Sequence, residues 1–281
     1  MKPTISVAIN TLNEEHNLGY ALRSVRSWVD QIVVVDMHSQ DRTREIAEEH
    51  GAEVYLHEPL GFADPARAFA VSKCRGDWLL ILDADELVPA RLSRTLQALS
   101  ARSDVDVVSI PRVNYILGEP LEHTGWGPRR DRHERFFRRG KLHTSARIHD
   151  CFRAAPDARR HTLDYESGNA IVHFNYVDLA QFIEKLNRYT SIEAQQALAR
   201  GDTARTLPAL LGAAHEFFRR YLVLRGYRDG WRGLYLSLMM AFYRIAAAAK
   251  LRELCSNGTR EVTLRHYAAQ AEAALADGGV P

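Results

Sequence analysis

Between residues 5 and 110 the chain alternates short apolar runs with amphipathic helical patterns, and this alternation constrains the fold most. Apolar, β-branched runs predict buried strands, and the periodic segments between them predict helices. Strands that alternate with helices are typical of parallel βαβ units with right-handed crossovers. We expect strands at residues 5–9, 31–35, 54–56, 78–82 and 105–110, separated by helices at 14–28, 41–50, 65–74 and 89–99.

Beyond residue 111 the pattern changes. Residues 111–172 predict strands and loops rich in Arg, His and Gly. Helices return after Asp178, which is a good N-cap residue, and continue at 208–225 and 231–253. We therefore expect an α/β domain over residues 1–172 and a helical region over 173–281, with an Ala-rich, frayed C-terminus.

The composition is that of an ordinary globular protein, with 46% hydrophobic and 26% charged residues. A net charge of +2 does not indicate a nucleic-acid binder, so we expect no nucleic-acid partner. The three cysteines lack metal-ligand spacing, and their odd count argues against a disulfide framework, so we expect a reducing, cytoplasmic location. No run reaches about 18 uninterrupted apolar residues, and the N-terminus lacks a signal-peptide pattern, so we predict neither a spanning helix nor a leader.

The most informative motif follows the apolar run at residues 78–82, where Asp83, Ala84 and Asp85 precede Glu86. In an open α/β sheet, ligands bind at the carboxyl ends of the strands. Crowded carboxylates repel one another unless a cation lies between them, and a divalent ion bound to diphosphate oxygens fits that need. A strand that ends in an acidic turn is the alternative interpretation of an isolated Asp-x-Asp.

Two other strands end in polar clusters. The first strand is followed by Asn10, Asn13 and Glu14, and the second by Asp36 and Ser39. These clusters should converge with the Asp-x-Asp motif on one crevice. Asp36, held at a strand end, can accept a hydrogen bond from a base or ribose, whereas Ser39 could equally cap the next helix.

These motifs resemble family 2 glycosyltransferases, and more closely the bacterial branch that adds sugars to lipopolysaccharide inner core and related glycans. Three N-terminal motifs carry the resemblance to the family, and three later elements narrow it to the branch. They lie at residues 5–15, 32–43 and 76–86, and at 135–140 (Arg-Phe-Phe-Arg-Arg-Gly), 185–190 (Lys-Leu-Asn-Arg-Tyr-Thr) and 227–230 (Tyr-Arg-Asp-Gly).

The resemblance implies a GT-A fold, with a Rossmann-like, mostly parallel sheet in a catalytic domain over residues 1–172 and a helical appendage. It also implies a nucleotide-diphospho-sugar donor, usually a UDP-sugar, with Mn²⁺ or Mg²⁺ as cofactor and inversion of the anomeric centre. Asp85 matches the metal ligand, and Asp83 matches a position near the ribose or the metal. The nucleotide-sugar site would comprise Asn10, Asn13, Glu14, Asp36, Ser39, Arg67, Asp83 and Ala84.

Inversion needs a general base for the acceptor hydroxyl. The family uses an acidic residue, and residues 125–135 fall where it is expected, so Asp131 is our first candidate and Glu134 the second. The branch often has Pro-Asp-x-Gln here, whereas two arginines follow Pro128, so the register stays open. His149 or His173 could supply a further metal ligand, with a structural role as the alternative for each.

The C-terminal helices carry arginines that alternate with aromatic residues over residues 217–232. Such a surface suits peripheral contact with the anionic inner membrane, where lipid-linked acceptors reside. Packing on the catalytic domain or in a homo-oligomer explains it equally well.

We expect a metal-dependent inverting glycosyltransferase, cytoplasmic or peripheral on the inner membrane, that uses a glycan or glycolipid acceptor. A non-catalytic nucleotide-sugar-binding subunit of cell-envelope glycan assembly is the alternative. A nucleotidyltransferase would need a glycine-rich loop after the first strand, and residues 10–15 contain no glycine.

Overall fold

The computed structural model describes residues 2–59, 64–144 and 152–276. The chain divides into two compact units, Met1–Val177 and Asp178–Pro281, which we describe separately. The boundary predicted after residue 172 falls within a strand, β12 (Ile171–Tyr176), because this strand pairs with β6 (Val107–Ile116) of the first unit.

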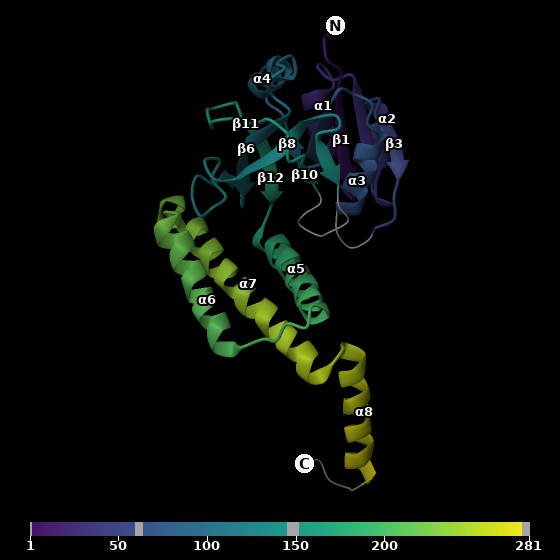
Figure 1. The fold of residues 1–281 in the computed structure, drawn as a ribbon. Coiled ribbons are helices and arrows are strands. Elements are labelled where there is room, and N and C mark those ends of the chain that lie inside the picture. The colour runs from purple at the N-terminus through teal and green to yellow at the C-terminus, as the bar shows by residue number, and fades with distance from the viewer. Residues whose placement is uncertain (1, 60–63, 145–151, 277–281) are drawn as a thin grey trace. The chain divides into compact units, whose positions relative to one another are not determined.

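The first unit contains the alternating strands and helices that the sequence predicts, shifted at their ends by a few residues. Helices α1–α4 follow β1–β4 in turn, with the two-residue β5 placed before α4 (Figure 1). The helices are α1 (Leu18–Val25), α2 (Thr43–Glu49), α3 (Asp64–Lys73) and α4 (Ala90–Ser100). The strands other than β6 and β12 are β1 (Ile5–Thr11), β2 (Gln31–Asp36), β3 (Glu53–Leu56), β4 (Trp78–Asp83), β5 (Glu86–Leu87), β7 (Glu119–Pro120), β8 (Arg132–Arg138), β9 (Leu142–Thr144), β10 (Phe152–Ala154) and β11 (Arg160–Thr162).

Within the described residues the main sheet has ten strands, and its central order is β3-β2-β1-β4-β8-β6-β12-β5. Strands β3, β2, β1 and β4 are mutually parallel, so their carboxyl ends lie at one edge. β8 lies between β4 and β6 and is antiparallel to both. The mostly parallel α/β architecture expected of a GT-A-type fold is therefore confirmed, with an antiparallel insertion that the sequence pattern did not predict.

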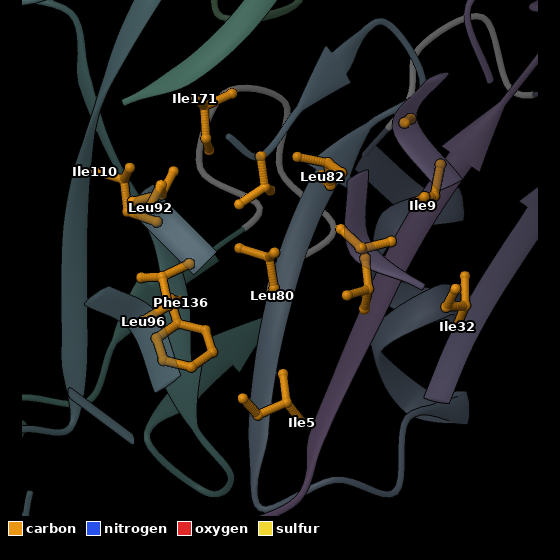
Figure 2. Packing of buried hydrophobic residues seen from close by; sticks show 14 of the residues in the cluster. Ile5, Ile9, Ile32, Leu80, Leu82, Leu92, Leu96, Ile110, Phe136 and Ile171 are labelled. Carbon is orange, nitrogen blue, oxygen red and sulfur yellow. The ribbon is translucent and has the colours of Figure 1, made fainter. Parts of the chain in front are cut away.

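The core lies on both faces of the sheet. On one face, side chains of β1, β4 and β8 pack against α1 and α4, and Figure 2 shows Leu80 and Phe136 in this cluster with Leu92 of α4. On the other face, Ala66 and Ala70 of α3 cover β1 and β2. Burial of this kind contributes about 25 cal/mol per Å² of apolar surface, which holds the strand ends in place.

A β-bulge lies at Arg135 in β8. Val108 of β6 pairs with Phe136, but the next residue, Ser109, pairs with Glu134, so Arg135 is the extra residue. A bulge reorients a side chain. The guanidinium of Arg135 contacts Asp83 at the end of β4.

The second unit is helical in its described part. Its helices are α5 (Leu179–Ala199), α6 (Thr206–Phe218), α7 (Gly230–Asn257) and α8 (Arg260–Ala276), with a π-helix η1 (Arg219–Val223) and a 3₁₀-helix η2 (Gly226–Asp229) between α6 and α7. Asp178 caps α5 as predicted, since its carboxylate accepts the backbone N–H of Gln181 at 2.8 Å.

The described part of the C-terminal segment is helical, and residues 277–281 lie outside the described residues. Residues 260–276 form α8, although none of its residues is buried. Its Ala, Glu and Gln residues have high intrinsic helix propensity, which explains a helix without a packed face.

One helical stretch, Gly226–Asn257, is long and apolar enough to cross a membrane by length and composition alone. The sequence pattern predicted no spanning segment, because Arg244 interrupts the apolar run. Core helices of other proteins have the same length and composition, so this property alone does not place the helix in a membrane.

Candidate active site

The loops after β1 and β2 are joined by hydrogen bonds. Asp36 is fully buried, and its carboxylate accepts both the backbone N–H and the hydroxyl of Ser39. The Ser39 hydroxyl oxygen in turn accepts the backbone N–H of Asn13, whose amide oxygen accepts the N–H of Gln40. Asn13 has φ 55°, a conformation that Asn tolerates better than most residues. The predicted nucleoside residues Asn13, Asp36 and Ser39 therefore lie together in one rigid loop pair.

The second predicted residue of this loop, Glu14, lies beside Asn13. Its backbone N–H donates to the hydroxyl of Thr43, and its carboxylate accepts from the Asn17 amide. Asp41 accepts the backbone N–H groups of Glu15 and Thr43, so it joins the loop after β1 to the start of α2.

Asp83 is neutralised by two arginines. Its carboxylate oxygens lie 2.5 Å from Nη2 of Arg67 and 3.0 Å from Nη2 of Arg135. Burial raises the pKa of Asp83, but Arg135 and Arg67 outweigh it and hold the pKa well below its usual range. Arg67 also donates to the side-chain oxygen of Asn10, so it connects this predicted residue to Asp83. Charge repulsion at Asp83 is relieved by arginines, where we had expected a metal ion.

Glu86 lies at the centre of the same cluster and is almost fully buried. Its carboxylate accepts the backbone N–H of Asp83 at 2.9 Å and lies 3.1 Å from Arg112 and 3.5 Å from Arg135. Burial and the charge of Asp83 raise the pKa of Glu86. The charges of Arg135 and Arg112 outweigh both effects, so the pKa lies below its usual value and Glu86 stays ionised. Ala84, between the aspartates, is buried.

Asp85 has a different environment. Its Oδ2 lies 3.3 Å from Nε2 of His173 on β12, and in the described part of the chain no arginine or lysine pairs with it. Three arginines therefore face four carboxylates, those of Asp83, Asp85, Glu86 and Asp131, which leaves one excess negative charge while the histidines are neutral.

The tautomer of His173 follows from its hydrogen bonds. The buried Asn114 amide donates to the Trp126 carbonyl at 2.8 Å and to Asp131 at 2.5 Å, which fixes its oxygen toward His173. That oxygen lies 2.7 Å from Nδ1 of His173 and can only accept, so Nδ1 carries a proton. In a neutral imidazole the lone pair of Nε2 then faces the Asp85 carboxylate.

The Asp85–His173 pair fits a divalent cation. Two lone-pair donors facing each other repel unless a proton or metal ion lies between them, and a ligating His commonly donates its other N–H to a carbonyl, as His173 does. No group of three or more His, Cys, Asp or Glu side chains suited to a metal occurs in the described ranges. Mg²⁺ commonly uses only one or two protein carboxylates and completes its shell with substrate phosphates, so a site with Asp85 as its single carboxylate needs no third protein ligand. His149 lies outside the described residues.

The two base candidates have different surroundings. Asp131 Oδ2 lies 2.9 Å from Nε of Arg112, and Oδ1 lies 2.8 Å from Nε2 of His133. Burial raises the pKa of Asp131, but the hydrogen bond from His133 and the charge of Arg112 lower it well below its usual range. Glu134 pairs with Arg160 of β11 at 3.0 Å. The structure thus connects Asp131, but not Glu134, to Asn114 and His173.

Sequence analysis missed Arg112, Asn114 and His133, and identified Arg135 only as part of a motif. A signal for the first two was present. They alternate with Val113 in β6, and two polar residues two positions apart in a strand face the same side. Their partners include Glu86 of β5, Asp131 just before β8 and His173 of β12, so the pairing depends on how these strands meet and was not readable.

Residues 6–155 match the profile of glycosyl transferase family 2. The chain belongs to this family and is a glycosyltransferase. It is 26% identical over 269 residues to an uncharacterized glycosyltransferase of Rickettsia bellii, covering 93% of this chain and 91% of that protein. It is 28% identical over 262 residues to the lipopolysaccharide core biosynthesis glycosyltransferase LpsC of Rhizobium meliloti, covering 89% of this chain and 92% of that protein.

Solved structures resemble the chain only over a part. Mannosyl-3-phosphoglycerate synthase from Rubrobacter xylanophilus is 26% identical, with a TM-score of 0.35, over 41% of each chain. Glucosyl-3-phosphoglycerate synthase from Mycobacterium tuberculosis, in complex with Mn²⁺, UDP and glucosyl-3-phosphoglycerate, is 24% identical with a TM-score of 0.32, over 40% of this chain and 44% of that one. The chain spans less than half the length of these structures, and at such scores the likeness carries no argument about mechanism.

The low pKa of Asp131 predicts an acid-sensitive contribution to stability. Its folded pKa lies below the unfolded value of about 3.9, so the contribution is complete above about pH 5 and is lost as pH falls toward the folded pKa. We expect Asp131→Asn to lower the free energy of unfolding at pH 7 by roughly 1–3 kcal/mol, and by clearly less at pH 3. Urea denaturation at both pH values measures this.

Asp164→Asn is the matched control, because the Asp164 side chain is 94% exposed. It should change the free energy of unfolding by less than about 0.5 kcal/mol at either pH. An Asp131→Asn effect of equal size at pH 7 and pH 3 would contradict the assignment of a low pKa.

Proposed function

We propose that this glycosyltransferase moves a sugar from a nucleotide-diphospho-sugar, a UDP-sugar in the first instance, to a glycan or glycolipid acceptor with inversion of the anomeric centre. Mn²⁺ or Mg²⁺ would be held by Asp85 and His173.

One observation carries the proposal: Asp85 has no arginine or lysine partner among the described residues, while its neighbour Asp83 has two arginines. The cluster therefore retains a single negative charge, located where His173 offers a lone pair. A divalent cation bound there neutralises charge on the leaving nucleoside diphosphate. Without a cation, an anionic diphosphate would be repelled from this edge of the sheet.

The protein's own residues supply positioning. The loop pair of Asn13, Asp36 and Ser39 offers a rigid support for the nucleoside, because its hydrogen bonds are made before a ligand arrives. Arg67 and Arg135 fix the Asp83 carboxylate, the group proposed to contact the ribose. Such preorganisation means that little reorganisation is needed on binding.

A lipopolysaccharide core glycan is the acceptor that we favour. The likeness to LpsC, a lipopolysaccharide core biosynthesis glycosyltransferase, supports this choice and covers 89% of the chain. Acceptor specificity depends on a few side chains, and changes of one methylene in a pocket are worth only about 1–3 kcal/mol. The acceptor is therefore to be identified by assaying transfer to candidate glycans.

Substitution of the proposed ligands tests the metal site. We expect Asp85→Asn and His173→Gln each to abolish the Mn²⁺-dependent rise in melting temperature caused by UDP, because the cation loses one of two protein ligands. Bound ligand at a hundredfold excess over Kd stabilises by about 2.7 kcal/mol, so a loss is easily measured by differential scanning fluorimetry.

Two exposed positions serve as controls: Asp164→Asn and His266→Gln should retain the full Mn²⁺-dependent shift. If both site variants kept the shift, the cation would not bind at Asp85 and His173. Release of nucleoside diphosphate from UDP-, GDP- or dTDP-sugars by the wild type separates an enzyme from a binding subunit, which would bind but not turn over.

We further propose that the second unit contacts the cytoplasmic face of the inner membrane, and its exposed side chains support this proposal. Large apolar side chains around η1 and η2 are more than half exposed, and Arg225 and Arg228 lie among them exposed. Arg219 and Arg220 are instead paired with Glu216, so they contribute less free charge. We call this surface the η1–η2 patch; its apolar members are Phe218, Leu222, Val223, Tyr227 and Trp231.

Sedimentation with vesicles tests this contact. The wild type should bind phosphatidylglycerol vesicles more tightly than phosphatidylcholine vesicles, and Arg225→Gln should weaken binding by roughly fivefold, since a basic residue near an anionic surface is worth about 1 kcal/mol. Trp231→Ser should weaken binding to both vesicle types, whereas the exposed α8 control Tyr267→Ser should not. The wild type could instead form a stable dimer and fail to bind vesicles. If Trp231→Ser then dissociated the dimer, the patch would be the contact with a second copy of the chain.

A further inference from the structure

An open groove lies between α6 and α7 within the second unit. The two helices lie side by side and are joined through η1 and η2, and the groove is at the opposite end of the pair from that connection (Figure 1). Its lining comes from the start of α6, with Ala209 and Leu210, and from the later part of α7, with Ile245 and Ala248. The groove holds about 140 Å³, similar to the ~150 Å³ apolar cavity that admits a benzene ring. It is therefore large enough for the end of one acyl chain.

Two arginines complete the lining, Arg205 just before α6 and Arg252 near the end of α7. The surface of the groove is nevertheless almost entirely apolar, so both residues line it with their methylene stems. Both are exposed, and neither forms an ion pair with a carboxylate in the described part of the chain. Two uncompensated positive charges therefore accompany an apolar groove.

The helices that form the groove supply no competing carboxylate. Residues 203–215 and 230–252 contain no Asp or Glu, and the second range holds three basic residues besides Arg252. Asp202, which precedes α6, is bound to Arg200 with 2.9 Å between Nη2 and Oδ2. Glu253 follows Arg252 directly, and neighbouring residues of a helix do not face each other. The groove therefore favours an anionic group at its rim.

An exposed apolar stripe on α7 connects the groove to the η1–η2 patch. Its members recur at intervals of four and three residues, which places them on one face of the helix. They are between 37% and 55% exposed, and two of them are the Trp and Tyr that are enriched at membrane interfaces. The stripe consists of Trp231, Tyr235, Leu238, Phe242 and Ile245. Because Trp231 belongs to the patch and Ile245 lines the groove, the groove opens on the face proposed to contact the membrane.

We propose that the groove binds one anionic phospholipid, with the end of an acyl chain between α6 and α7 and the phosphate held by Arg205 and Arg252. Small alanine side chains leave a narrow apolar space that suits a chain, and the arginines carry the charge that a phosphate requires. The inference goes beyond the proposed membrane contact, which needs only an anionic surface and no lipid bound at a fixed stoichiometry.

Binding of a monomeric lipid tests the groove apart from the membrane surface. The full chain is titrated with dodecanoyl lysophosphatidylglycerol below its critical micelle concentration, by isothermal titration calorimetry. We expect one lipid per chain, and binding of dodecanoyl lysophosphatidylcholine that is weaker by at least about fivefold, because its headgroup carries no net charge. Inorganic phosphate should neither bind measurably nor displace the lipid, since it has no chain.

Substitutions separate the charged rim from the apolar groove. Arg205→Gln and Arg252→Gln should each weaken binding of the anionic lysolipid by roughly fivefold and leave binding of the choline lysolipid unchanged. Ala248→Phe should abolish binding of both, because the ring fills the groove, and its melting temperature shows whether it is folded. The exposed α8 controls Arg265→Gln and Ala269→Phe should bind as the wild type does.

The outcomes distinguish this inference from the proposed membrane contact. The inference is overturned if the wild type binds neither lysolipid, binds both equally, or keeps its affinity in both arginine variants. Displacement by inorganic phosphate would indicate an anion site without a chain and overturns it too, as does a dimer that Ala248→Phe dissociates without lipid binding. If the wild type binds the lysolipid but no vesicles, the membrane contact fails and the groove stands. Trp231→Ser should keep the lysolipid affinity, because it lies at the other end of the stripe.

Discussion

The arrangement of the site depends on how carboxylates and arginines compensate one another at the carboxyl end of β4. Asp83 and Glu86 are taken out of water, and burial of unpaired charges costs several kcal/mol per ion. Arg67, Arg112 and Arg135 offset that cost from three different elements, α3, β6 and β8. None of these arginines pairs with Asp85, so the negative charge of its carboxylate is not neutralised. A cation would bind at this remaining charge.

Asn114 links His173, which faces Asp85, to Asp131. It is fully buried, and its three hydrogen bonds reach Trp126, Asp131 and His173. Its amide fixes the tautomer of one histidine directly, and by holding Asp131 it positions the other. A buried network of this kind stabilises one geometry only when every member is satisfied. The bulge at Arg135 serves the same end, since it directs a buried guanidinium to the Asp-x-Asp motif.

The sequence was sufficient for the parts of the fold that local pattern determines. Strands β1–β4, their helices and the strand-end residues Asp36 and Asp83 follow from apolar runs and the polar residues that end them. The insertion of β8 between β4 and β6 depends on contacts across more than fifty residues, as with Trp78 and Arg138. Arg112 lies on β6 and Asp131 just before β8, so their pairing depends on how these strands meet, whereas His133 is only two residues from Asp131 and this local pair was overlooked. The arginine compensation of Asp83 was not foreseen, because Arg67 and Arg135 come from α3 and β8.

The central claim is that a divalent cation binds between Asp85 and His173 when the nucleotide is present. Anomalous diffraction from crystals grown with UDP and Mn²⁺ tests it most directly. The account predicts a manganese peak within coordination distance, about 2.0–2.3 Å, of the Asp85 carboxylate and Nε2 of His173, with the diphosphate completing its shell. A manganese peak bound by the diphosphate but remote from both side chains would contradict it.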